Sequence, residues 1–159
     1  MASAKRSAGI LLFRRGTRHP IEILLVHPGG PFWERKDAGV WTIPKGEHEE
    51  DEDPLEAARR EFEEETSHRP DGRFHPMPPV KQKSGKIVLG WAMEGDFDPA
   101  QLRSNTFEVE WPPRSGRKRA FPEVDRAEWF GLEEAAVKIR PEQKPFLDEV
   151  RRIASETAR

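Results

Sequence analysis

The stretch "GEHEEDEDPLEAARREFEEETS", residues 46–67, holds eleven acidic residues and only two basic ones. Its net charge is −9 in a chain of 159 residues whose total is −2, so the remaining residues carry +7. A negative block inside a positive body suits a site where metal ions meet a polyanionic ligand. Charge alone leaves a solvated acidic surface open as the alternative.

The second half of this stretch predicts a helix that begins at Asp53 and Pro54. Aspartate is a good N-cap residue, and proline is tolerated at the first helical position. At about 100° per residue, Leu55, Ala58 and Phe62 form a narrow stripe that we expect to face the core.

The glutamates of this helix divide into two groups. Glu56 and Glu63 fall on the far side and are expected to lie in water, whereas Glu61, Glu64 and Glu65 share a face beside the core stripe. Like charges one turn apart repel by a few tenths of a kcal/mol per pair, and burial raises a carboxyl pKa. A divalent cation compensates both effects, and Mg²⁺ binds through a few carboxylates, water and substrate phosphates. A solvated face bound by the two neighbouring arginines is the alternative.

Composition restricts the kind of site further. The chain has no cysteine, which excludes disulfides and thiolate metal sites, and its five histidines share no ligand spacing. An oxygen-bound metal is therefore expected. No apolar run reaches membrane length, and the N-terminal segment lacks the cleavage site of a signal peptide, so we expect a cytoplasmic protein.

The rest of the sequence predicts a mixed sheet covered by helices, the α/β class, in one domain spanning residues 1–159. Two segments rich in proline, glycine or charge, residues 69–79 and 112–126, are expected to be irregular. Strands are expected at 7–15, 21–28, 40–44, 86–95, 106–111 and 127–132, and helices from 54, at 133–139 and at 141–156.

The acidic stretch also resembles the signature of the Nudix hydrolases. Gly46, five residues, Glu52, seven residues and then "REFEEE" from Arg60 to Glu65 match the spacing of that motif. Two positions depart from it, since Ser67 replaces a glycine and His68 an apolar residue. Replacing glycine where φ > 0 is needed costs on the order of 1 kcal/mol, but no metal ligand is lost.

The resemblance implies an α/β/α sandwich around a mixed β-sheet and hydrolysis of a diphosphate linked to another moiety. It implies that the Gly46 carbonyl, Glu61 and Glu65 hold Mg²⁺ or Mn²⁺, with Glu64 as a further ligand or as the base. Arg60 would orient these carboxylates.

Segments outside the motif, "IEILLVHP", "WTIPKGE" and "DRAEWFGLEEA", are similar to the asymmetrical diadenosine tetraphosphate hydrolases within the family. In that comparison Glu123 matches a carboxylate that serves as an extra metal ligand or base. A loop acid beside Arg126 is the alternative.

Four residues are candidates for substrate binding: Lys45 beside the turn glycine, Arg114 and Arg117 on a basic loop, and Trp33, which could stack on a base together with Phe32. An exposed loop and an aromatic loop anchor are the respective alternatives. We expect a nucleotide-type small molecule as the substrate, no nucleic-acid or membrane partner, and a monomer or homodimer.

These expectations combine into Mg²⁺-dependent hydrolysis of a phosphoanhydride bond, with a dinucleoside polyphosphate or a nucleoside triphosphate as the substrate. The alternative is a non-catalytic Nudix-like module that senses a nucleotide. A sensor has no need of all four glutamates of the motif, and they are present here. A calcium-binding loop is a second alternative, and catalysis is favoured over it because "EEDEDP" lacks the glycine and spaced terminal glutamate of an EF-hand.

Overall fold

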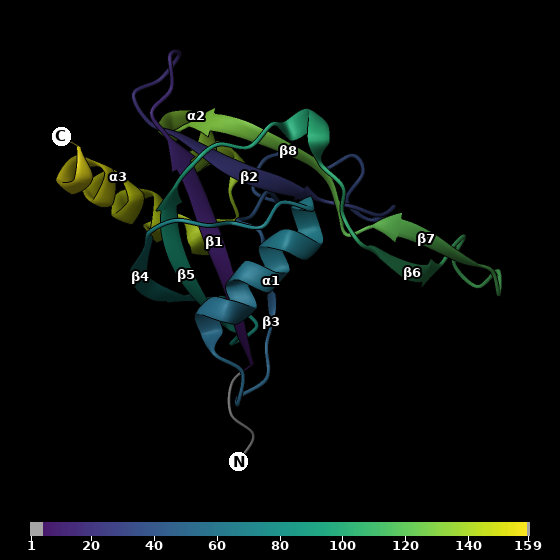
Figure 1. Ribbon diagram of the computed structural model, residues 1–159. Coiled ribbons are helices and arrows are strands. Elements are labelled where there is room, and N and C mark those ends of the chain that lie inside the picture. Colours follow the sequence, from purple (N-terminus) through teal and green to yellow (C-terminus); the bar gives the residue numbers. More distant parts are fainter. Residues whose placement is uncertain (1–4, 159) are drawn as a thin grey trace.

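A computed structural model describes residues 5–158, and its central feature is a six-stranded mixed sheet (Figure 1). Strand β1 runs parallel to β5, and the other pairs are antiparallel. The order is β4-β5-β1-β2-β8 with β3 paired to β1, and the strands are β1 (Arg6–Arg14), β2 (Glu22–Pro28), β3 (Lys45–Glu47), β4 (Phe74–Lys81), β5 (Ile87–Glu94) and β8 (Val124–Gly131).

Helices cover both faces of this sheet. On one face, Ile10 and Leu12 of β1 pack with Phe62 of α1 (Pro54–Thr66). The intervening residues of β1 point to the other face, where Leu11 belongs to one core with Val150. That face is covered by α2 (Leu132–Lys138) and α3 (Pro145–Thr157), the latter preceded by a 3₁₀ turn, η2 (Pro141–Gln143). The expected α/β/α sandwich around a mixed sheet is confirmed.

The segment before α1 forms its strand later than expected. Trp41 and Thr42 make only isolated bridges, and the regular strand is β3, in which Lys45 pairs with Gly9 of β1. Pro44 has no N–H to donate, so the strand resumes after it. Lys45 and the glycine after it, which was expected to lie in a turn, are therefore part of the sheet, and they lie beside α1.

The proline-rich segment 69–79 was expected to be irregular, and this is wrong for its second half. Strand β4 lies at the edge of the sheet, where Pro76 pairs with Trp91 and a bulge separates Met77 from Val80. Proline is tolerated at such an edge because its missing N–H leaves no partner strand unsatisfied.

The expected loop 112–126 is also partly a strand. Strands β6 (Thr106–Glu110) and β7 (Lys118–Pro122) form a two-stranded ribbon that projects away from the central sheet (Figure 1). Phe107 and Val109 of β6 are only half-buried. A 3₁₀ turn, η1 (Pro99–Gln101), precedes the ribbon. None of the helices within residues 5–158 is long and apolar enough to cross a membrane.

Candidate active site

Helix α1 begins as the sequence predicts, with the Asp53 side chain accepting a hydrogen bond from the Glu56 N–H at 3.0 Å. Its buried face differs from the expected stripe. Leu55 is half-buried, and Glu61 and Glu65 lie on the buried face together with Ala57, Ala58, Phe62 and Thr66. Two acidic side chains thus lie inside the surface that packs on the sheet, rather than beside it.

Glu65 is the more deeply buried of the two, with 5% of its surface exposed. Its carboxylate accepts a hydrogen bond from the backbone N–H of Lys45 on β3, at 3.2 Å. Burial, followed by repulsion from Glu61, raises the pKa of Glu65 well above its ordinary value. Such a carboxylate needs a positive partner to remain ionised at neutral pH.

Glu61 lies against Gly46 of β3. A Cβ atom added to Gly46 would lie 2.1 Å from the Cδ atom of Glu61, so the carboxylate occupies the space of a side chain at position 46. Burial and then repulsion from Glu64 raise the pKa of Glu61. Because Gly46 has no side chain, the backbone of β3 and the carboxylate oxygens of Glu61 lie close together.

Arg60 connects three of the carboxylates. Its Nε and Nη2 donate to the two oxygens of Glu52 at 3.1 and 3.2 Å. Its Nη1 donates to Glu61 at 2.9 Å and to Glu64 at 3.2 Å. The predicted orienting contact of Arg60 is present, and Glu52 joins the loop before α1 to this network.

Glu123 lies between β7 and β8 and close to the same face of α1. Its backbone N–H donates to the Asn105 carbonyl at 2.9 Å, and the Asn105 N–H donates to the Glu64 carbonyl at 2.9 Å. Burial and then repulsion from Glu64 raise the pKa of Glu123. Within residues 5–158 it forms no ion pair with Arg126, whose guanidinium lies over the Trp41 ring. The structure thus brings Glu123 to the acidic helix.

The donor set fits a hard divalent cation. It combines carboxylate oxygens from Glu61, Glu64 and Glu65 with a glycine backbone. Burial, followed by repulsion between the carboxylates, raises the pKa of Glu61 and of Glu65. In the described chain, no three acidic or histidine side chains already converge as a metal centre. Glu61 and Glu64 are bound to Arg60 instead.

The predicted substrate residues lie in three places: on β3, in the turn of the ribbon and in the loop after β2. Lys45 lies on β3 beside Glu65, and burial followed by repulsion from Lys86 lowers its pKa. Arg114 and Arg117 lie in the turn at the far end of the ribbon, away from α1 (Figure 1). Trp33 is half-buried, with the Lys36 ammonium 5.0 Å from its ring centroid.

Sequence reasoning missed cations that come from distant segments. Lys5 and Arg6, at the start of β1, line a cavity of about 300 Å³ together with Glu52 and Arg60 of the acidic network. Lys86 pairs with Glu47 at 2.8 Å. No spacing in the sequence could reveal these neighbours, because strand pairing brings them together.

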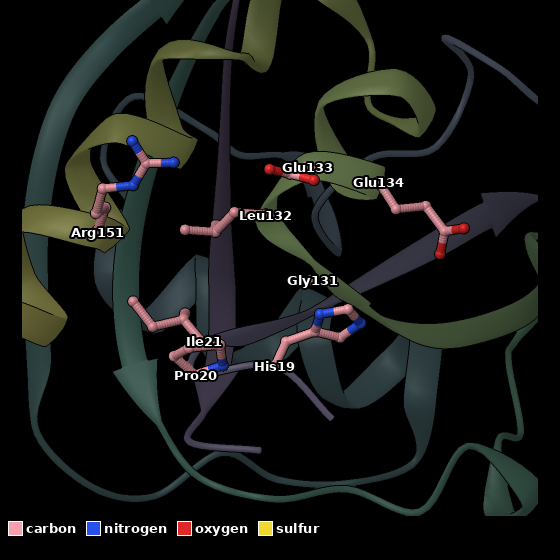
Figure 2. A pocket seen from close by; sticks show the side chains of 8 residues that line it. All are labelled: His19, Pro20, Ile21, Gly131, Leu132, Glu133, Glu134 and Arg151. Atoms are coloured by element: carbon pink, nitrogen blue, oxygen red, sulfur yellow. The ribbon is translucent and has the colours of Figure 1, made fainter. Parts of the chain in front are cut away.

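A second cavity, of about 420 Å³, lies at the β1–β2 turn (Figure 2). Figure 2 shows the His19 ring beside Gly131, with Arg151 of α3 across the hollow. None of the glutamates of the acidic network lines it. This cavity is therefore separate from the acidic face of α1.

Comparisons with known proteins identify the family of the chain and support its fold. The chain is 30% identical over 127 residues to an RNA pyrophosphohydrolase of Rhizobium meliloti, covering 70% of each chain. Its fold is similar to a Caenorhabditis elegans Ap4A hydrolase, with a TM-score of 0.65 at 22% identity over 94% of this chain and 98% of that one. It is also similar to the NUDIX domain of Shewanella oneidensis NrtR in complex with ADP-ribose, with a TM-score of 0.64 at 15% identity over 96% and 90%. The sequence model of the NUDIX domain matches residues 4–150, so the chain belongs to the Nudix family, as its acidic motif indicated.

Proposed function

We propose that this protein is an enzyme that uses Mg²⁺ or Mn²⁺ to hydrolyse a phosphoanhydride bond in a nucleotide. Dinucleoside polyphosphates, with diadenosine tetraphosphate first, and nucleoside triphosphates are the foremost substrates. The observation that carries the proposal is the position of Glu61, between the Gly46 backbone and the Arg60 guanidinium. We also propose that the chain forms a single Nudix domain, that the protein is a monomer or a homodimer, and that it is cytoplasmic.

Metal binding is assigned to the Gly46 carbonyl, Glu61, Glu64 and Glu65. The bound cation would neutralise phosphate oxygens and lower the pKa of the attacking water. Arg60 holds Glu61 and Glu64 in place, because its planar guanidinium can donate to several carboxylates at once. The contribution of the protein is mainly positioning and charge stabilisation.

Proton removal from the attacking water is assigned to Glu64 or Glu123. Glu64 is half exposed and hydrogen-bonded to Arg60, so it can reach both ligand and solvent. Glu123 lies near it on a different segment. A carboxylate with a raised pKa is a stronger base near neutral pH than an ordinary one. This favours Glu123 as the group that accepts the proton together with Glu64.

Turnover of a substrate panel in ¹⁸O-labelled water tests the proposal. The panel contains dinucleoside polyphosphates, nucleoside triphosphates, ADP-ribose and nucleotide sugars with Mg²⁺, and the labelled product identifies the phosphorus attacked. Glu64→Gln and Glu65→Gln should abolish turnover while the fold survives. Glu63→Gln is the matched control, because Glu63 is exposed and pairs only with Arg69 among the described residues. A near wild-type rate for Glu65→Gln contradicts the site assignment.

The 5′-triphosphate end of RNA is a second candidate substrate. The relative with 30% identity is an RNA pyrophosphohydrolase, and the ribbon of this chain carries Lys118 and Arg119 on β7 as well as arginines in its turn. An RNA oligonucleotide with a 5′-triphosphate therefore belongs in the panel, although the sequence alone led us to expect no nucleic acid. The non-catalytic sensor predicts binding of a nucleotide without any labelled product.

A further inference from the structure

A cavity at the base of the β6–β7 ribbon has no role in the chemistry described so far. Its volume is about 330 Å³. It lies between the loop that follows β2 and the ribbon, and its lining includes Glu34, Trp111, Arg119, Phe121 and Asp125.

Two adjacent glycines allow the loop to approach the ribbon and close this cavity. A Cβ atom on Gly29 would lie 2.0 Å from the Pro122 carbonyl oxygen. Gly30 has φ +99°, and a Cβ atom there would lie 2.8 Å from the Phe107 ring. Any other residue would push the loop and the ribbon apart, so the double glycine builds the cavity wall.

Aromatic side chains form the apolar part of the cavity and its rim. Phe32 packs edge-on against Trp111, with ring centroids 5.7 Å apart, although 56% of its surface is exposed. The Arg119 guanidinium lies 5.3 Å from the centroid of Phe121. Nucleobases stack on such aromatic faces.

The polar groups of the cavity suit a base that offers both donors and acceptors. Within residues 5–158, Glu34 forms no hydrogen bond or ion pair, although Arg119 lines the same cavity. Asp125 is already bound by the His27 ring, at 2.7 Å. A free carboxylate can accept from the N1–H and 2-amino groups of guanine, and arginine can donate to its O6 and N7 atoms.

The cavity is adjacent to the acidic network. Pro122 lines it and directly precedes Glu123, and the Gly29 N–H donates to the Glu123 carbonyl at 2.8 Å. A nucleotide whose base lay here could therefore extend its phosphates toward Glu123 and Glu64. The volume is near the lower end of ligand cavities, about 300–1,000 Å³, and suits one nucleoside rather than two.

We propose that this cavity binds the base of the nucleotide substrate and prefers guanine, with Trp111 as the stacking surface and Glu34 as the acceptor for its N–H groups. A guanine-containing polyphosphate then replaces diadenosine tetraphosphate as the first member of the proposed substrate class. The direction in which the phosphates of the bound nucleotide extend, toward Glu123 and Glu64, rests on the proposed function. The binding of the base in the cavity does not. Phe32 and Trp33 were the predicted stacking pair, and the proposal replaces Trp33 with Trp111 in that pair.

Calorimetric titration with nucleoside monophosphates, without metal and without turnover, tests the proposal. GMP should bind about tenfold more tightly than IMP, which lacks the 2-amino group, and more tightly than AMP and UMP. Trp111→Ala should weaken GMP about tenfold or more, since stacking on an aromatic side chain accounts for much of the affinity for a base. Glu34→Gln should remove the difference between GMP and IMP.

Glu108→Gln is the matched control, because Glu108 is an exposed acid of the same ribbon that does not line the cavity. It should leave all four affinities unchanged. Circular dichroism checks the fold of each variant, and Glu34→Gln on an exposed loop keeps the test decisive if Trp111→Ala unfolds the ribbon. Equal affinities for the four nucleotides, or unchanged affinity and selectivity in Glu34→Gln, overturn the proposal.

The outcome is distinguishable from that of the proposed function. If GMP binds with this pattern but nothing in the substrate panel is hydrolysed, the inference stands and the hydrolase proposal fails. If polyphosphates are hydrolysed and the KM values of Trp111→Ala and Glu34→Gln equal that of the wild type, the hydrolase proposal stands and the inference fails.

Discussion

The Glu61 carboxylate occupies the space that a side chain at position 46 would need, with its Cδ atom 2.1 Å from the Cβ position of Gly46. Gly46 pairs with Ala8 of β1, and Glu61 lies on the buried face of α1. This relationship fixes strand β3 and helix α1 against each other at the acidic network. It also explains the glycine without any appeal to its backbone angles.

Gly46→Ala should therefore displace Glu61 rather than unfold the chain, because the end of a glutamate side chain can move. We expect kcat/KM to fall about 100-fold, since a displacement of about 1 Å in a positioned group has effects of that size. Thermal melting without metal should change little. Wild-type kinetics in this variant would contradict the assignment of Glu61.

Arg60→Lys should lower activity about tenfold to 100-fold, because an ammonium cannot reproduce the four hydrogen bonds of the guanidinium to three carboxylates. The neighbouring Arg59→Lys is the matched control, since the described hydrogen bonds of the Arg59 side chain go to the exposed Glu56 and a backbone carbonyl, and its guanidinium lies over the Phe74 ring. Steady-state kinetics over a range of Mg²⁺ concentrations measures both variants. Equal losses at the two positions would contradict a specific role of the Arg60 hydrogen bonds.

Glu65→Gln should stabilise the metal-free protein at neutral pH. The folded-state pKa of Glu65 lies well above its unfolded value, so the native state retains its proton to higher pH. Its contribution to stability is then fully present below the unfolded pKa, about 4.3, and is lost as pH rises through the folded pKa. Replacing the carboxylate with an amide avoids this loss of stability at high pH. Each 1 kcal/mol in the free energy of unfolding corresponds to roughly 2–4 °C in the melting temperature of a chain of this size.

Thermal melts in a chelator between pH 5 and pH 8 check this prediction. The melting temperature of Glu65→Gln should exceed that of the wild type by an amount that grows with pH. Mg²⁺ should stabilise the wild type and have a smaller effect on the variant. A wild type that is more stable than the variant at pH 8 in chelator would show that burial does not penalise this carboxylate.

The sequence predicted the parts of the site that lie on one helix. Helical spacing and the motif together selected Glu61, Glu64, Glu65 and Arg60, and each lies on or beside the face that meets β3. Helical spacing also placed Glu63 on the solvent side of the helix, and Glu63 is exposed in the structure. The sequence misplaced the centre of the buried face of α1. A helical-wheel projection with Leu55 as the reference assumes that the most apolar side of the helix faces the core, whereas Glu61 and Glu65 lie on the buried face of this helix.

The parts that the sequence did not predict depend on strand pairing. The ribbon strand β7 follows charged and glycine-rich residues, and its register is set by β6, with Glu110 opposite Lys118. Lys86 reaches Glu47 because β5 and β3 both pair with β1. Such contacts require knowledge of which strands are neighbours, and periodicity along one strand does not contain it.

Ser67 supplies the final prediction, because it occupies the position where the family motif has glycine. It ends α1 in the left-handed conformation, with φ 63° and ψ 21°, and its N–H donates to the Glu63 carbonyl at 2.7 Å. A non-glycine residue there costs about 1 kcal/mol. The Ser67 hydroxyl donates to the Arg103 carbonyl at 2.6 Å, and a hydrogen bond of this kind contributes about 1 kcal/mol.

The two effects have opposite signs, so Ser67→Gly should change the free energy of unfolding by less than about 0.5 kcal/mol. Ser67→Ala keeps the backbone strain and loses the hydrogen bond, and should destabilise the protein by about 1 kcal/mol. Denaturant unfolding of the two variants measures the difference, and their kcat values should equal that of the wild type because no metal ligand changes. Because both variants lack the hydroxyl, a Ser67→Gly variant that is the less stable of the two would contradict the strain assigned to the left-handed conformation.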